Sequence, residues 1–170
     1  MNWLNKELKD KAVSLGLCKE WQGLWNENWS PGKMADMMYK GIDFCLKNRF
    51  PSKEFIKENF DISMLRDNNI FADDKRSVNN PQQSLIIGES DVKVRYNGYG
   101  AGVIYVLDNS YVTITAKNRS FAIVHAFDKS TINAEKFDIA NLVILKHSEN
   151  VTVIAGDGIL VKEEYDYLKD

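Results

Sequence analysis

Metal-binding residues are scarce in this chain. Its 170 residues include 2 Cys and 2 His, and Cys18, Cys45, His125 and His147 form no pair at short spacing. A structural zinc site usually draws four ligands from these residue types, so we expect no metal site and no cofactor. Nothing in the spacing of the cysteines calls for a disulfide, and we interpret both as buried thiols of a cytosolic protein.

Long apolar runs and an excess of one charge are also absent. Residues 1–10 lack the apolar core of a signal peptide, and no apolar stretch has the length needed to span a bilayer. We therefore expect cytoplasmic residence and no membrane partner. The 22 Lys+Arg and 24 Asp+Glu give a formal net charge of −2. Nucleic-acid binding usually leaves a basic domain or stripe, so the charge argues against a nucleic-acid partner.

A ten-residue repeat dominates the chain from Asp91 onward. Each unit opens with a small or polar residue, carries apolar residues mostly two and four positions later, and follows a turn former two positions earlier. The openers are Ser110, Ser120, Ser130, Ala140 and Asn150, and the turn formers are Asp108, Asn118, Asp128, Asp138 and Ser148. A fixed period of one strand and one turn is the signature of a solenoid.

The alternation within the repeat predicts an inside and an outside. Even-numbered positions are apolar and often small, which suits a narrow interior; they include Val112, Ile114, Val124, Ile144 and Ile154. Odd-numbered positions are mixed, which suits a partly covered exterior; they include Phe121, Ile123, Val143, Leu145 and Val153. Short hairpins prefer Asn-Gly or Asp-Gly turns, and none of these turns has a Gly after its Asp or Asn. A parallel solenoid, with two or three units per coil, is therefore favoured over an antiparallel meander.

The N-terminal region follows a helical period instead. Leu4, Leu8 and Ala12 recur at helical spacing. Ser30-Pro31 is a helix start signal for a helix that runs through Gly41 to Leu46, and Ser52 is the expected N-cap of another helix. The sequence thus predicts an α+β protein: a helical head over residues 1–72, a polar linker over 73–83, and a small β-solenoid over 84–170. The charged segment 162–170 is expected to close the far end of the solenoid.

No catalytic motif stands out. The acidic residues Asp108, Asp128 and Asp138 occupy turn positions, where Asp is favoured for backbone reasons. Gly98-Tyr-Gly-Ala-Gly102 lacks the Lys-Ser/Thr ending of a phosphate loop and precedes a strand instead of a helix. The sequence identifies no nucleophile and no orienting acid for His125, so we interpret His125 as structural. These patterns favour a protein that is not an enzyme.

Four segments of the head and the tail units resemble a known group of proteins. The segments are Cys18-Lys-Glu-Trp-Gln-Gly-Leu-Trp25, Asn28-Trp-Ser30, Tyr39-Lys-Gly-Ile-Asp-Phe-Cys45 and Pro51-Ser-Lys-Glu-Phe-Ile-Lys-Glu-Asn-Phe60. They resemble an uncharacterised group from bacteriophages and mobile elements of gut bacteria, in which a similar helical head precedes short β-repeat units. The resemblance transfers no functional residue. It implies a role outside housekeeping metabolism, for example in conflict between phage and host.

We expect a non-enzymatic binding protein that engages a protein partner, for example to inhibit a host defence protein. Large aromatic side chains are typical interface anchors, and the candidate partner-binding residues are Trp25, Trp29, Lys33, Tyr99 and Tyr105. Two alternatives remain open. The first is a structural protein that self-assembles into a homo-oligomer through apolar outer faces. The second is a small polysaccharide hydrolase or lyase, which requires paired carboxylates in a cleft.

Overall fold

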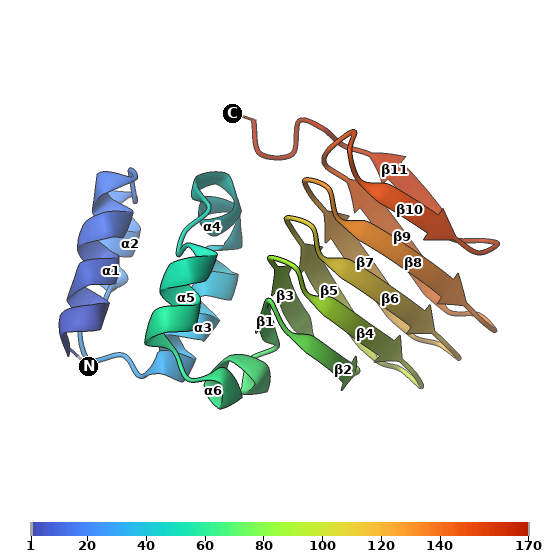
Figure 1. Ribbon diagram of the computed structural model, residues 1–170, viewed down its shortest axis with the longest axis horizontal. Coiled ribbons are helices and arrows are strands. Elements are labelled where there is room, and N and C mark those ends of the chain that lie inside the picture. Colours follow the sequence, from blue (N-terminus) through green and yellow to red (C-terminus); the bar gives the residue numbers. More distant parts are fainter. Residues whose placement is uncertain (1, 170) are drawn as a thin grey trace. The chain divides into compact units, whose positions relative to one another are not determined.

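We describe a computed structural model of the chain, which covers residues 2–169 (Figure 1). The chain divides into two compact units, with the boundary between Asn68 and Asn69. The first unit is helical and the second is a β-solenoid, as the two periods in the sequence predict.

The helical unit consists of short helices joined by tight turns. They are α1 (Asn2–Ser14), α2 (Lys19–Leu24), α3 (Pro31–Lys40), α4 (Ile42–Asn48), α5 (Lys53–Asn59) and α6 (Ile62–Asp67). Side chains at helical spacing meet in its core, because each helix buries one stripe; the buried set includes Leu4, Leu8, Ala12, Met34, Leu46, Ile56 and Leu65. Of the two cysteines, Cys18 is exposed, contrary to expectation, and Cys45 is half-buried.

Side-chain caps set the helix starts that the sequence signals. The Ser30 hydroxyl accepts a hydrogen bond from the Lys33 amide (3.2 Å), and the Ser52 hydroxyl accepts one from the Phe55 amide (3.2 Å). The expected helix through Gly41 is instead two helices, because Gly41 adopts φ −102° and ψ 31° and separates α3 from α4. The Trp21 ring lies near Gly41, where a Cβ would be 3.6 Å from it, an ordinary van der Waals distance.

The second unit winds the chain into two stacked parallel sheets. Sheet A contains β1 (Ile70–Ala72), β3 (Gln83–Ile87), β5 (Ala101–Val106), β7 (Phe121–Ala126), β9 (Asn141–Lys146) and β11 (Leu160–Glu163), in that spatial order. Sheet B contains β2 (Lys75–Asn79), β4 (Asp91–Tyr96), β6 (Tyr111–Ala116), β8 (Thr131–Lys136) and β10 (Thr152–Ala155), in that order. Successive strands alternate between the sheets, so two ten-residue units make one coil (Figure 1).

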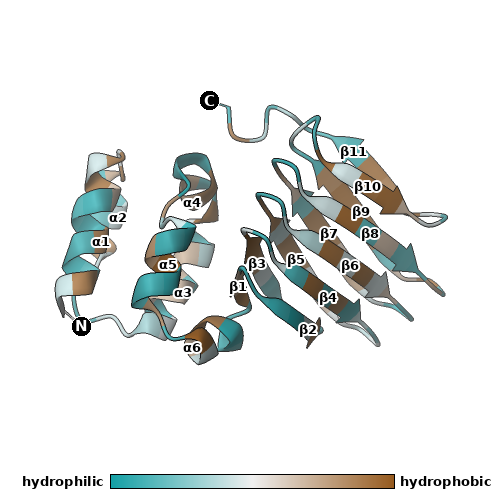
Figure 2. Ribbon diagram, in the orientation of Figure 1, coloured by the Kyte–Doolittle hydropathy of each residue, from teal (hydrophilic) through white to brown (hydrophobic). Residues whose placement is uncertain are grey.

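The segment 73–83, expected as a linker, lies within the solenoid. It contains β2, which pairs in parallel with β4. This strand escaped recognition because it is short and largely hydrophilic (Figure 2), as edge strands commonly are. Together with β1 it brings the start of the solenoid forward to about residue 70.

The register repeats with every second unit through the middle coils. Val92 pairs with Val112, which in turn pairs with Ile132, and the same offset holds between β5, β7 and β9 in sheet A. Equivalent side chains therefore stack directly above one another, about 4.8 Å apart.

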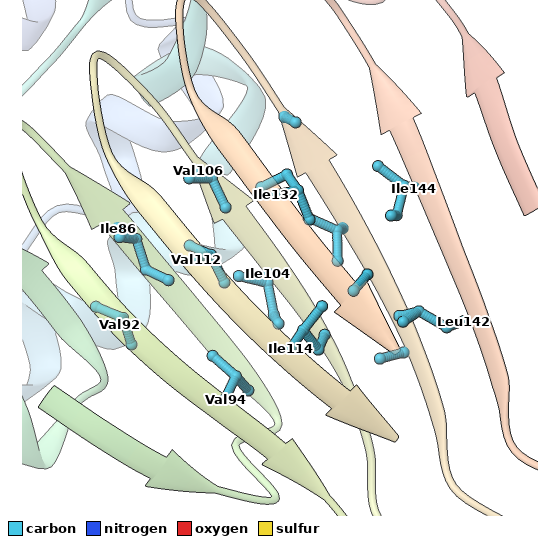
Figure 3. Packing of buried hydrophobic residues seen from close by; sticks show 14 of the residues in the cluster. Ile86, Val92, Val94, Ile104, Val106, Val112, Ile114, Ile132, Leu142 and Ile144 are labelled. Atoms are coloured by element: carbon cyan, nitrogen blue, oxygen red, sulfur yellow. The ribbon is translucent and has the colours of Figure 1, made fainter. Parts of the chain in front are cut away.

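The interior is a stack of aliphatic side chains that project from both sheets (Figure 3). The inward residues of the middle coils are 0–2% exposed; among them are Val92, Val94, Ile104, Val106, Val112, Ile114, Val124, Ile132, Leu142 and Ile144. These are even-numbered positions, so the predicted inside is confirmed for the middle coils. Small residues such as Ala116 and Ala122 keep the interior narrow.

The last coil departs from this parity. The regular offset would pair Thr131 with Val151, but Thr131 pairs with Thr152. The preceding turn therefore contains one extra residue, which exchanges the inward and outward positions of β10. Val153 pairs with the inward Ile132, and Ile154 pairs with the outward Asn133 and is 57% exposed. The expectation that Ile154 points inward and Val153 outward is therefore wrong.

Asp and Asn residues turn the corners between the sheets. Asp108, Asn118, Asp128 and Asp138 all adopt positive φ between 57° and 60°, a left-handed conformation that Asp and Asn tolerate better than other side chains. Their carboxylates also link coils: Asp108 Oδ2 accepts a hydrogen bond from the Gly88 amide (2.7 Å), and Asp128 Oδ2 accepts one from the Asp108 amide (2.8 Å). The repeat of turn formers thus follows from two requirements at one position.

The glycine cluster before β5 is a crowded corner. A side chain at Gly100 would overlap the side-chain carboxamide of Asn80. A side chain at Gly102 would overlap the Pro81 carbonyl oxygen and the Tyr96 hydroxyl. Tyr96 is buried and its hydroxyl donates to Pro81 O (2.7 Å). The large Tyr96 and the absent side chain at Gly102 therefore fit together inside the coil.

The two roles of the corner residue can be separated at Asp108. We expect Asp108→Asn to leave the free energy of unfolding nearly unchanged, because both the left-handed conformation and the acceptor are kept. Asp108→Gly keeps only the conformation and loses about 1 kcal/mol. Asp108→Ala loses both and costs roughly 2–3 kcal/mol. Urea unfolding of the three variants measures this order, and an equal loss in the Gly and Ala variants would contradict the conformational part.

Candidate interaction surface

The outer face of sheet A carries a column of aliphatic side chains. Val103, Ile123 and Val143 stack in register on β5, β7 and β9, and Leu160 of β11 continues the column. The first three are half-buried and Leu160 is 48% exposed. Phe121, 42% exposed, stands beside the column at the start of β7. We call these five residues the apolar face of sheet A.

The outer face of sheet B differs in character. On β4, β6 and β8 the same strand positions hold charged, hydroxyl and carboxamide side chains: Lys93, Arg95, Thr113, Thr115, Thr131, Asn133 and Glu135. Ile154 on β10 is the outward aliphatic residue of this face. Tyr111, 39% exposed, is the counterpart of Phe121 at the start of β6. The coil geometry demands apolar residues only inside, so nothing in the solenoid itself requires one apolar exterior and one polar exterior.

An aromatic cluster borders the apolar face where the strands of sheet A end. The Tyr105 and His125 rings stack with centroids 5.1 Å apart, and Phe127 stacks on His147 at 4.6 Å. Tyr167 packs against His125, Phe127 and His147 with centroids 4.3–6.1 Å away. His125 is only 9% exposed and Phe127 only 4%.

The C-terminal segment 164–169 folds back onto this cluster. The chain turns after β11 (Figure 1), and the Glu164 amide donates to Lys146 O (2.8 Å). Tyr167 then reaches the rings on β7 and the corner beyond it. The expectation that the segment 162–170 closes the end of the solenoid is therefore wrong for the residues described: 160–163 form β11, and 164–169 lie outside sheet A. Asp170 lies outside the described residues.

The two histidines form a hydrogen-bonded pair with a defined direction. His147 Nδ1 lies 2.8 Å from Glu164 O, and His125 Nδ1 lies 2.9 Å from His147 Nε2. A carbonyl oxygen only accepts, so His147 Nδ1 donates; in neutral His147, Nε2 then accepts the proton of His125 Nδ1. Burial lowers the pKa of His147 and outweighs the opposing effect of Glu164. The neutral form of His147 therefore fits the docked C-terminal segment.

The tryptophans proposed as partner anchors are held within the helical unit. The Trp25 indole N–H donates to Asn5 Oδ1 (2.6 Å), and Asn5, buried in α1, donates in turn to Asn26 O (3.1 Å). Trp25 and Trp29 lie with ring centroids 5.4 Å apart, and both are half-buried. Lys33 is in the first turn of α3, where its ammonium group pairs with Asp36 at 2.8 Å. A partner role for these residues stays a prediction.

The two proposed tyrosines lie at opposite ends of β5. Tyr99 is in the corner before the strand and is 80% exposed, with the Arg119 guanidinium 5.9 Å from its ring centroid. It lines a shallow groove of about 360 Å³ with Arg119, Asp138 and Ile139. Tyr105 belongs to the aromatic cluster instead. The structure therefore does not bring Tyr99 and Tyr105 together.

Sequence reasoning missed the aromatic cluster, although a signal for it exists. Tyr105 and His125 are separated by two repeat units, and so are Phe127 and His147. Once the coil length is known, these separations place the rings on adjacent coils. A ten-residue repeat alone leaves two or three units per coil open, so the neighbours could not be identified. Tyr167 follows the last strand and carries no repeat signal.

Acidic side chains of the solenoid corners are engaged with the backbone. Asp138 Oδ2 accepts a hydrogen bond from the Asn118 amide (3.0 Å), as Asp108 and Asp128 do with their neighbouring coils. These bonds support their interpretation as turn residues. Among the residues described, no group of three or more His, Cys, Asp or Glu gathers in a way that could hold a metal ion.

The chain matches no protein-family model, no curated protein and no solved structure. Across residues 2–169, none of the helices has both the length and the apolar character needed to cross a membrane.

We expect docking of the C-terminal segment to weaken as the pH falls. An exposed histidine titrates near 6.5, and the pKa of docked His147 lies lower. Below about pH 6.5 the released state therefore binds more protons than the docked state, which favours release. Protonation also places an N–H at Nε2, facing His125 Nδ1. The NMR signals of residues 165–169, followed from pH 7.5 to 5.5, measure the release.

His147→Phe is the matched control for this titration. It keeps a ring for stacking against Phe127 and Tyr167 but removes the group whose pKa is shifted. The variant loses the hydrogen bond to Glu164 O at every pH, but the docked fraction of the segment should then not change over the same pH range. Equal release in this variant would show that His147 is not the titrating group.

Proposed function

We propose that this chain is a protein-binding module of a bacteriophage or mobile element, and that it binds its partner through the apolar face of sheet A. The observation that carries the proposal is the difference between the two exteriors. Val103, Ile123 and Val143 form an aliphatic column on one side, whereas Thr113 and Asn133 occupy matching positions on the other. Parallel sheets are commonly covered on both faces.

A rigid, flat surface suits binding to a folded partner. The in-register strands hold the apolar side chains in fixed positions, so little conformational entropy is lost on binding. Phe121 supplies a large exposed ring of the kind that anchors interfaces. The partner we propose is a protein with an apolar, flat patch of its own, since a charged patch would be desolvated without compensation.

The resemblance of segments within residues 18–60 to proteins of phages and mobile elements supports the cellular setting. In that setting the partner is a host protein in the bacterial cytoplasm, and the mechanism is occlusion of its surface. Inhibition of a defence protein is the biological role that we propose. It requires no reaction at the site, and the corner carboxylates described above are already bonded to the backbone.

Site-specific photo-crosslinking in the host bacterium tests the proposal. A benzophenone side chain at Phe121 should give a discrete adduct with one host protein. The same group at Tyr111 is the matched control, because both residues begin a strand and their exposures are 42% and 39%. Equal adducts at both positions would contradict a specific role for sheet A, and adducts containing only this chain would indicate self-association instead.

A charge on the apolar face should abolish the adduct. We expect Ile123→Lys, combined with the crosslinker at 121, to reduce adduct yield roughly tenfold or more, because a buried lysine would lose its hydration. Thr113→Lys is the control, because Thr113 is the third residue of β6 in sheet B, as Ile123 is the third residue of β7 in sheet A. Urea unfolding of both variants verifies that the fold is intact.

A further inference from the structure

The last coil of the solenoid leaves two strand edges open. β11 is last in sheet A and β10 is last in sheet B, and within residues 2–169 neither pairs with a strand on its far side. Side chains of this coil are exposed accordingly: Ile154 57%, Leu160 48% and Val161 38%. Val161 is an inward position, in register with the buried Ile144. The apolar interior therefore reaches solvent at this end.

The outer edge of sheet B at the opposite end is protected in a way that β10 is not; the charges of the last coil, Lys162 and Glu163, lie in the second half of β11. β2 carries Lys75 and Arg76, and Arg76 occupies an inward position opposite Val92. Charges on an edge strand, especially inward ones, prevent pairing with another chain. β10 reads Thr-Val-Ile-Ala, with no charge and no proline. Only one of the two outer edges of sheet B thus carries such protection.

We propose that two copies of this chain join end to end through their last coils, with β11 of each copy pairing antiparallel with β10 of the other across a two-fold axis. Leu160 then lies opposite Ile154 of the second copy, Val161 opposite Val153, and Lys162 opposite Thr152. Sheet A of one copy continues into sheet B of the other, and the two interiors become one.

A second copy is the occupant because both edges must be satisfied at once. β10 and β11 stand one sheet spacing apart, about 10 Å, with apolar side chains between them. A single added strand would pair with one edge and leave the other open. The last coil of another copy presents two edges at the same spacing and with the same apolar filling, so it matches both.

The side chains select the cross pairing over the other two-fold arrangement. If β11 paired with β11 around Val161, Leu160 would face Lys162 of the second copy, and Ile154 would face Thr152 in the matching β10 pair. The cross pairing instead places the two most exposed aliphatic side chains of the coil, Ile154 and Leu160, against each other. Apolar cross-strand pairs stabilise a sheet, whereas an apolar residue opposite a charge does not.

The end face is small, which limits the strength of the dimer. It is about one sheet spacing wide and four residues long, less than the roughly 800 Å² per partner of a standard interface. We therefore expect a reversible dimer that dissociates in the micromolar range. Growth stops at two copies, because a two-fold contact uses both open edges.

Sedimentation equilibrium of the full chain between about 1 and 500 µM tests the contact. We expect a reversible monomer–dimer equilibrium. Ile154→Lys and Leu160→Lys should each raise the dissociation constant roughly tenfold or more, because a charge on an edge strand opposes pairing. Ile139→Lys is the control, since Ile139 is 64% exposed and lies in the corner 137–140 of the preceding coil, which belongs to neither open strand.

Cysteine pairing tests the register. In a Cys18→Ser background, a mixture of Ile154→Cys and Leu160→Cys chains should form a disulfide-linked dimer, whereas either variant alone should not. Burial raises the pKa of the remaining Cys45 to about 12, which keeps it as an unreactive thiol. A crosslink in the Leu160→Cys chain alone would overturn the cross pairing.

A chain that stays monomeric at the highest concentration, or a dimer that neither lysine variant weakens, would overturn the end-to-end contact. Both results leave the proposed function untouched, because Val103, Phe121, Ile123 and Val143 lie outside the end-to-end contact. Leu160 belongs to both surfaces, so Ile154→Lys is the variant that affects the dimer alone. Conversely, Ile123→Lys should abolish partner crosslinking and leave the monomer–dimer equilibrium unchanged. The two proposals can therefore fail separately.

Discussion

The parallel ladder of backbone hydrogen bonds is the interaction on which the solenoid depends, and it continues around the corners. Between strands, the Asn109 amide still donates to Gly88 O (3.1 Å) and the Lys129 amide to Asp108 O (3.1 Å). Because the chain must turn without breaking this ladder, one residue per corner adopts a left-handed conformation. That requirement and the hydrogen bond that the corner side chain accepts from the neighbouring coil together explain the repeated Asp and Asn. The fixed register then stacks equivalent side chains in the middle coils.

The periodicity of the sequence was sufficient to predict the coil and its interior, but not its ends. The apolar side chains at even strand positions from Val92 to Ile144 are buried because each coil repeats the same geometry. At the ends, local features override the period. The polar β2 resembles a linker because an edge strand buries little, and one extra residue before Thr152 reverses the inside and outside of β10.

The candidate surface could not be recognised from the sequence, because the odd positions of the two sheets were considered together. Odd positions taken together are mixed in character, as the sequence shows, because Ile123 and Val143 belong to sheet A whereas Thr113 and Asn133 belong to sheet B. Only a coil of two units separates them into an apolar and a polar exterior. The sequence could not decide the role of the proposed anchors Trp25 and Trp29 for another reason: an aromatic ring in a short chain suits a core and an interface equally well.

The exact stacking of the middle coils has a consequence for how such a chain can change its length. Removal or duplication of two successive units, such as the segment 111–130, deletes or adds one whole coil and leaves every remaining neighbour of the same kind. Each such change lengthens or shortens the apolar face by about 4.8 Å, and both terminal coils keep their own side chains. The length of the solenoid can therefore change in steps of one coil without any change in either terminal coil.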